Sequence, residues 1–140
     1  MLNQLPMLLL MTAIPSVAED ILTRGYLYAH LKFMKPVWWI LLSSAVYVLN
    51  HIWRLSDGAA VLTYLFLLGL VLAAAVWIKR SLWLAFGIHW GANIAFESTH
   101  SMVQTKTIVQ HEGPLWILAG IWALLLLVLA MIYRKKEKPL

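Results

Sequence analysis

Five apolar segments, separated mostly by short polar stretches, constrain this 140-residue chain more than any other feature. They cover roughly residues 8–31, 37–53, 59–78, 82–96 and 115–133. A helix needs about 20 apolar residues to cross the hydrocarbon core of a membrane, at about 1.5 Å per residue. The second and fourth segments are short for this, so we expect tilted helices or irregular ends there. The pattern predicts an all-α, polytopic membrane helix bundle with about five transmembrane helices.

The composition supports the same fold class. Hydrophobic residues make up 62% of the chain and charged residues 12%, whereas about a quarter of the residues of a soluble domain are charged. So few charges cannot cover a soluble surface. Cysteine is absent, which excludes disulfides, a thiolate nucleophile and a Cys-ligated metal. We expect a single membrane domain over residues 1–140, and the polar stretch between residues 97 and 113 is left unassigned.

The basic residues predict an orientation through the positive-inside rule. With the carboxyl terminus in the cytoplasm, eight of the 11 Lys and Arg residues fall on that side, namely Lys32, Lys35, Lys79, Arg80, Arg134, Lys135, Lys136 and Lys138. Only Arg54 and Lys106 then lie outside, and Arg24 lies within a segment. We therefore expect a multi-pass protein with a cytoplasmic carboxyl terminus and an outside amino terminus. Residues 1–10 carry no charge, so they lack the basic region of a signal peptide, which indicates a shortened form of a longer protein.

Interaction partners follow from where the net charge of +5 is placed. The basic residues lie between the apolar segments, which is typical of membrane proteins and not of a nucleic-acid surface. We therefore expect membrane lipid as a partner and no nucleic acid. Five Trp residues near segment ends, Trp38, Trp39, Trp53, Trp77 and Trp83, are expected to be anchors at the membrane interface.

Several ionisable or amide side chains lie inside the apolar segments. A charged side chain near the centre of a membrane costs at least about 2.5 kcal/mol on insertion scales, so such residues mark functional sites. The first segment contains Glu19, Asp20 and Arg24, the second contains His51, and the fourth contains His89 and Asn93. At about 1.5 Å per residue, His89 is about 14 Å from the cytoplasmic ends, and Glu19 and His51 are about 20 Å from them. These depths predict one site formed by three helices.

Helical spacing indicates which side chains share a face. Asp20 and Arg24 are four residues apart and can pair, while Glu19 is rotated by about 100° from Asp20. The same spacing joins Tyr47 to His51 and His89 to Asn93. Each feature also has a structural interpretation, because an Asp–Arg pair can hold helices together and a single His or Asn often only bridges them. Their occurrence together favours a functional site.

The residue types exclude several membrane-enzyme chemistries. The chain has no His-Glu-x-x-His motif and no Gly-x-Ser-x-Gly motif, and Glu19 and Asp20 are adjacent, so they cannot flank a substrate as an aspartic dyad does. A carboxylate can still activate water with one His, while the other His and the Asn stabilise an oxyanion. Alternatively, Glu19, His51 and His89 are a plausible three-ligand zinc set with water in the fourth position. The residues alone leave both chemistries open.

Three motifs follow one another along the chain: Glu19-Asp20-x-x-x-Arg24, Tyr47-x-x-x-His51 and His89-x-x-x-Asn93. This order resembles the CPBP (Abi) family of intramembrane proteases, which includes the type II CAAX prenyl endopeptidases and has the pattern EExxxR, FxxxH and HxxxN. The motif core covers about residues 14–96. Two positions depart from the family pattern, since Asp20 replaces a Glu and Tyr47 replaces a Phe.

The resemblance implies a glutamic-type intramembrane endopeptidase. Its catalytic residues would be Glu19, His51, His89 and Asn93, supported by Asp20, Arg24 and Tyr47. It implies no cofactor, with zinc as the alternative, and a peptide or lipidated protein as substrate. Neither the residues nor the resemblance predicts the oligomeric state. Two other interpretations remain: a non-catalytic immunity or scaffold protein that retains the fold, and a path for protons or ions.

Overall fold

The computed structural model describes residues 5–98 and 113–137. Its helices are α1 (Leu5–Asp20), the short α2 (Leu27–His30), α3 (Pro36–Leu49), α4 (Ala59–Lys79), α5 (Leu82–Glu97) and α6 (Gly113–Glu137). A π-helical turn, η2 (Ile21–Tyr26), joins α1 to α2, and a 3₁₀ turn, η3 (Ile52–Arg54), follows α3. The described ranges contain no strand. With α1, η2 and α2 taken as one continuous segment, the five predicted helical segments are confirmed.

Three of the described helical segments are long and apolar enough to cross a membrane: Leu5–His30, Ala59–Lys79 and Gly113–Arg134. The segment Pro36–Leu49 is apolar but shorter, and α5 has only 16 residues. The second and fourth segments are therefore the short ones, as the sequence predicts. The connection between the fourth and fifth apolar segments contains His100, Lys106 and His111, and these residues lie outside the described part of the chain.

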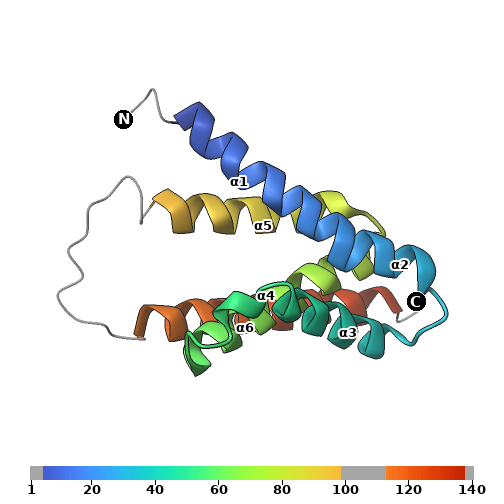
Figure 1. Ribbon diagram of the computed structural model, residues 1–140. Coiled ribbons are helices and arrows are strands. Elements are labelled where there is room, and N and C mark those ends of the chain that lie inside the picture. The colour runs from blue at the N-terminus through green and yellow to red at the C-terminus, as the bar shows by residue number, and fades with distance from the viewer. Residues whose placement is uncertain (1–4, 99–112, 138–140) are drawn as a thin grey trace.

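Helix α4 lies at the centre of the bundle and contacts α3, α5 and α6, while α1 packs along α5 (Figure 1). Of its most apolar 18-residue window, 67% is buried, compared with 17% for the Leu5–His30 segment and 11% for α6. The two outer helices therefore present most of their apolar side chains to the surroundings, as expected of helices in contact with lipid.

The close packing of α3 on α4 depends on Gly69. A Cβ atom at this position would lie 3.2 Å from the Cα of Ser44 and 3.2 Å from a ring carbon of Tyr47. Small residues permit such close approach between membrane helices. This contact fixes the Tyr47 side chain, which is 2% exposed, on the inner face of α3.

The five Trp residues near segment ends divide into two groups. Trp38, Trp53 and Trp83 are exposed, with 63%, 67% and 80% of their surface accessible, as interfacial anchors would be. Trp39 and Trp77 are instead buried, and Tyr28 packs edge-on against both, with ring centroids 5.5 Å and 5.8 Å apart. The anchor prediction was therefore wrong for Trp39 and Trp77, because position along a helix does not show which face meets a neighbour.

The connections of the bundle separate by charge. The α2–α3 connection, the α4–α5 connection and the carboxyl-terminal end of α6 lie at one end of the molecule, and the α3–α4 connection lies at the other (Figure 1). The first two connections carry Lys32, Lys35 and Arg80. Arg80 has a left-handed backbone (φ 54°) that ends α4, and its guanidinium lies 4.6 Å from the Trp77 ring centroid. These basic residues therefore lie at one end of the bundle, and the side of the membrane that this end faces stays a prediction.

Candidate active site

The first motif lies across the junction of α1 and the π-helical turn η2. Asp20 Oδ1 pairs with Arg24 Nη1, as their spacing predicts, and both side chains are buried. Arg24 Nη1 also donates to Thr23 Oγ1 at 2.9 Å, and its Cζ lies 4.7 Å from the Tyr47 ring centroid. The buried guanidinium is therefore stabilised by a carboxylate and by a cation–π contact. These contacts tie the motif to α3.

The π-helical turn was not predicted from the sequence. In such a turn the backbone bonds join residues five apart, so carbonyl groups near the transition need other donors. Thr23 Oγ1 lies 2.7 Å from the carbonyl oxygen of Glu19, and Ser43 Oγ of α3 lies 2.7 Å from the carbonyl oxygen of Thr23. Side-chain hydroxyl groups thus stabilise the turn that follows Glu19 and Asp20 at the end of α1.

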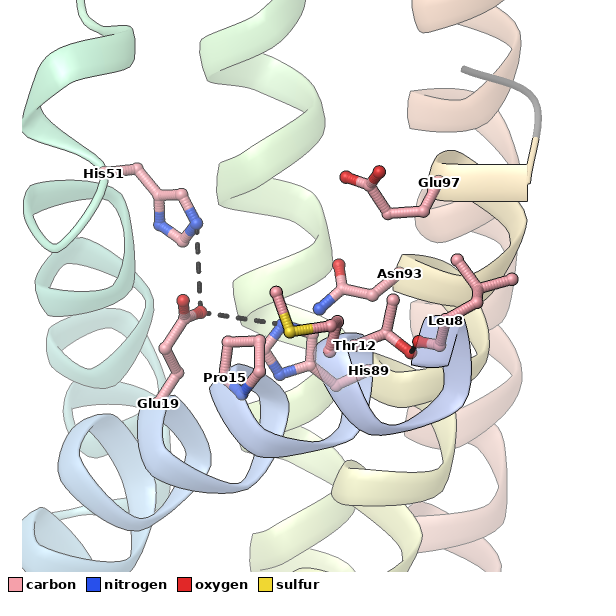
Figure 2. A pocket seen from close by; sticks show the side chains of 9 residues that line it. Leu8, Thr12, Pro15, Glu19, His51, His89, Asn93 and Glu97 are labelled. Carbon is pink, nitrogen blue, oxygen red and sulfur yellow. Dashed lines mark hydrogen bonds and ion pairs between the residues drawn. The ribbon is translucent and has the colours of Figure 1, made fainter. Parts of the chain in front are cut away.

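The Glu19 side chain points toward His51 and His89 (Figure 2). Its Oε2 atom is 3.8 Å from Nε2 of His51 and 3.6 Å from Nε2 of His89. Both distances exceed those of an ordinary hydrogen bond. Within residues 5–98 and 113–137, this buried oxygen has no hydrogen-bond partner. Three groups from distant parts of the chain therefore converge on one place without bonding directly to one another.

His51 lies beyond the end of its helix. The sequence predicts a helix as far as residue 53, but α3 ends at Leu49, and His51 lies in the turn before η3. Its Nδ1 is 2.9 Å from the carbonyl oxygen of Tyr47. A carbonyl only accepts, so Nδ1 carries a hydrogen, and Nε2 is the nitrogen on the side of Glu19.

His89 is the most enclosed member of the site, at 1% exposure. Its Nδ1 lies 3.3 Å from Asp20 Oδ1, and its Nε2 lies 3.3 Å from the hydroxyl oxygen of Tyr47. An ionised carboxylate only accepts, so Nδ1 of His89 is the donor in that pair. The ring is thus held from two sides, by α1 and by α3. The hydroxyl of Tyr47, which the family pattern lacks, has His89 as its partner.

Asn93 connects α5 to α1. Its Nδ2 donates to Ser16 Oγ at 2.9 Å, and one turn away Trp90 Nε1 donates to Thr12 Oγ1 at 3.1 Å. Sequence reasoning missed Ser16 and Thr12. A signal was present, because Thr12, Ser16 and Asp20 recur every four residues in a helix whose one further polar side chain is Glu19, and all three are buried.

These groups surround a cavity of about 340 Å³ (Figure 2). Its lining consists of Leu8, Met11, Thr12, Pro15, Glu19, His51, His89, Asn93 and Glu97. All four predicted catalytic residues face the cavity, whereas Asp20, Arg24 and Tyr47 lie behind them. The volume is at the small end of the range for ligand sites and far exceeds the roughly 30 Å³ of one water. The cavity can therefore hold a short peptide segment with a water molecule.

Among the residues that the structure describes, no three His, Cys, Asp or Glu side chains are arranged to hold a metal ion. Glu19 Oε2 lies within 3.8 Å of Nε2 of both His51 and His89. The zinc alternative stays a prediction.

Comparison with protein families agrees with the resemblance that the motif order indicates. The family described as type II CAAX prenyl endopeptidase Rce1-like matches residues 1–95, more than half of the chain. The chain belongs to this family. The matched part of the Rce1-like chain includes all seven predicted site residues, and α6 follows it. Family membership and the apolar helices identify an integral membrane protein and support protease activity in general. Comparison with curated proteins and with solved structures found no match.

Proposed function

We propose that this Rce1-like chain is an intramembrane endopeptidase that hydrolyses a peptide bond with a water activated by Glu19. The observation that carries the proposal is the position of Glu19 Oε2. It is buried and lacks a hydrogen-bond partner in the described part of the chain, and it lies 3.8 Å and 3.6 Å from two imidazole nitrogens of residues that line the same cavity. A water in that space can contact the carboxylate and a ring nitrogen together, which suits general base catalysis.

The chemistry follows from the hydrogen positions. Glu19 takes a proton from the water as the water oxygen bonds to the peptide carbonyl carbon. The bare Nε2 of His51 accepts a hydrogen bond from the second hydrogen of that water, which orients its attack. Glu19 then returns the proton to the leaving nitrogen as the carbon–nitrogen bond breaks. The products are a carboxylic acid and an amine, and Glu19 is restored.

The developing oxyanion needs donors that are already in place. Asn93 supplies an N–H group, because its Nδ2 has two hydrogens and Ser16 takes one. His89 can donate from Nε2 only when its ring carries a second proton, because Nδ1 is directed at Asp20. Asn93 is thus the donor that is ready at any protonation state, and His89 adds to it as the imidazolium. Tyr47 and Asp20 hold the His89 ring between them.

The substrate we propose is a peptide or a lipidated protein that approaches from the membrane. Leu8, Met11 and Pro15 give one wall of the cavity an apolar surface beside the polar groups. Such a wall suits an apolar residue next to the cleaved bond. We place the amino terminus outside and the carboxyl terminus in the cytoplasm, on the basis of the distribution of basic residues.

The central test is Glu19→Gln. The amide keeps the shape of the side chain but cannot accept a proton at neutral pH, so we expect kcat to fall by about 10²–10⁴-fold. The protein is reconstituted in liposomes and assayed with a quenched fluorogenic peptide that ends in a farnesylated CAAX sequence. The matched control is Asp57→Asn, since Asp57 is half exposed, pairs with Arg54 and lies away from the cavity lining. Undiminished cleavage by Glu19→Gln would overturn the proposal in favour of a non-catalytic role.

The same assay decides between the metal-free and the zinc chemistry. We propose a metal-free reaction, so 1,10-phenanthroline should leave kcat unchanged, and purified protein should contain far less than stoichiometric zinc. Stoichiometric zinc, together with activity that is lost on chelation and recovered on zinc addition, would make Glu19 a ligand and not the base.

A further inference from the structure

The side-chain amide of Asn93 has two ends of opposite chemistry. Only the NH₂ end can donate to an oxyanion, while the oxygen end would repel one. We propose that Ser16 is a positioning residue that fixes the NH₂ end of Asn93 in the orientation that catalysis needs. The inference rests on the proposed function, and it assigns a role to a residue outside the three motifs.

The orientation follows from counting hydrogens. Ser16 Oγ lies 2.7 Å from the carbonyl oxygen of Thr12 and 2.9 Å from Nδ2 of Asn93. A hydroxyl group has one hydrogen, and a carbonyl oxygen can only accept. Ser16 therefore gives its hydrogen to Thr12 and is left with lone pairs for Asn93. Only the NH₂ end of the amide can meet those lone pairs favourably.

A flipped amide would be disfavoured at this position. The Oδ1 atom would then face the Ser16 lone pairs with no hydrogen between them, and two polar atoms would lose their partners. Water cannot replace the lost bond, because Ser16 is 0% exposed. In the observed orientation, one hydrogen of Nδ2 is bound to Ser16 and the other remains for the cavity, whose wall includes Asn93 (Figure 2).

Ser16 acts through Asn93 and not on the substrate. It is not one of the residues that line the cavity, whereas its neighbour Pro15 is. It lies on α1 three residues before Glu19. One helix therefore supplies the general base and also orients the oxyanion donor that α5 carries.

The test is Ser16→Ala, assayed in liposomes with the farnesylated CAAX peptide. We expect kcat to fall by about 10- to 100-fold, with KM within about twofold of wild type, because the hydroxyl touches the donor and not the substrate. Ser44→Ala is the matched control: Ser44 is also 0% exposed, but its hydroxyl donates to the carbonyl of Ile40 in its own helix. This control should keep the wild-type kcat. Ser16→Cys, which keeps the side-chain shape with a weaker acceptor, should show a smaller loss than Ser16→Ala.

A second measurement does not depend on activity. The ¹H–¹⁵N signals of the Asn93 side-chain amide should shift in Ser16→Ala and stay in place in Ser44→Ala. In an Asn93→Ala background, Ser16→Ala should cause no further loss of kcat. Unmoved amide signals, an unchanged kcat in Ser16→Ala, or an additive loss in the double variant would each overturn the inference. A fully active Glu19→Gln variant would refute the proposed function instead, and the amide signals would still report the orientation of Asn93.

Discussion

The α4–α6 pair and the α1–α5 pair are held together by different interactions. Val71 and Ala74 of α4 form an apolar cluster with Leu129 of α6, and the most apolar windows of these helices have mean hydropathies of 2.5 and 2.7. The Leu5–His30 segment has a mean hydropathy of 1.5, and hydrogen bonds from Trp90 and Asn93 join α5 to α1. Three of the four predicted catalytic residues, Glu19, His89 and Asn93, lie on the α1–α5 pair, and His51 lies in the turn after α3.

The difference shows how a membrane protein can hold a precise site. Lipid is as apolar as the helix surface, so apolar contact alone sets helix rotation weakly. Hydrogen bonds are directional, and each one fixes both the rotation and the axial position of the helices that it joins. The α1–α5 pair therefore fixes Glu19, His89 and Asn93, while α3 positions Tyr47 and the turn that carries His51. Among the described residues, none of α4 or α6 lines the cavity.

The largest effect is expected from disrupting the buried Asp20–Arg24 pair. Arg24→Met keeps most of the side-chain volume but leaves Asp20 buried without its partner, so we expect a loss of about 3–5 kcal/mol in unfolding free energy. The free energy is measured by denaturant titration of the protein in mixed micelles. Arg80→Met, at an exposed cation near the end of the bundle, should change it by less than about 1 kcal/mol. Equal effects of the two substitutions would contradict the importance assigned to the buried pair.

An intermediate effect is expected where α4 packs on α3. In Gly69→Ala the added methyl meets Ser44 and Tyr47 at 3.2 Å, so α3 and α4 must move apart, at a cost of about 1–3 kcal/mol. Gly91→Ala is the matched control on α5, because a Cβ there has no atom within 4 Å. The same titration should show Gly91→Ala to be neutral or slightly more stable. A neutral Gly69→Ala would mean that the α3–α4 contact is looser than described.

The smallest effect is expected at Tyr47, whose hydroxyl joins α3 to His89 of α5. Tyr47→Phe removes the hydroxyl that contacts His89 and restores the residue of the family pattern. We expect unfolding free energy to fall by about 0.5–1.5 kcal/mol and kcat to change by less than about tenfold. Tyr26→Phe, at a ring that is 58% exposed, should change neither quantity. A loss of cleavage as large as that of Glu19→Gln would show that the Tyr47 hydroxyl takes part in the chemistry.

Much of this architecture was predictable, because membrane helices are recognised by the length of their apolar segments, and side chains that share a face are recognised by four-residue spacing. The five segments and the Asp20–Arg24 pair followed directly from those two signals. The end of α3 at Leu49 and the π-helical turn did not follow from them. The turn depends on a contact with another helix, the bond from Ser43 Oγ to the carbonyl of Thr23, and apolar residues continue past the end of α3. The burial of Trp39 and Trp77 was missed for a similar reason: spacing shows which residues share a helix face but not which helix packs against that face.

The candidate site shows the same limit in more detail. The sequence indicated that Glu19, His51, His89 and Asn93 could converge, and the structure places all four around one cavity. The sequence could not indicate which nitrogen of His51 and of His89 faces the cavity. Each ring is oriented by a contact of its Nδ1, with the carbonyl of Tyr47 for His51 and with the carboxylate of Asp20 for His89. Their catalytic roles stay predictions until the variants are assayed.

Helix α1 contributes Glu19 and the acceptor for Asn93, yet most of its surface is not covered by the rest of the bundle. A change in bilayer thickness or lipid packing that tilts this helix would displace Glu19 and the Ser16 hydroxyl that holds Asn93 by the same motion. Turnover should therefore respond to the surrounding lipid well before the bundle itself comes apart.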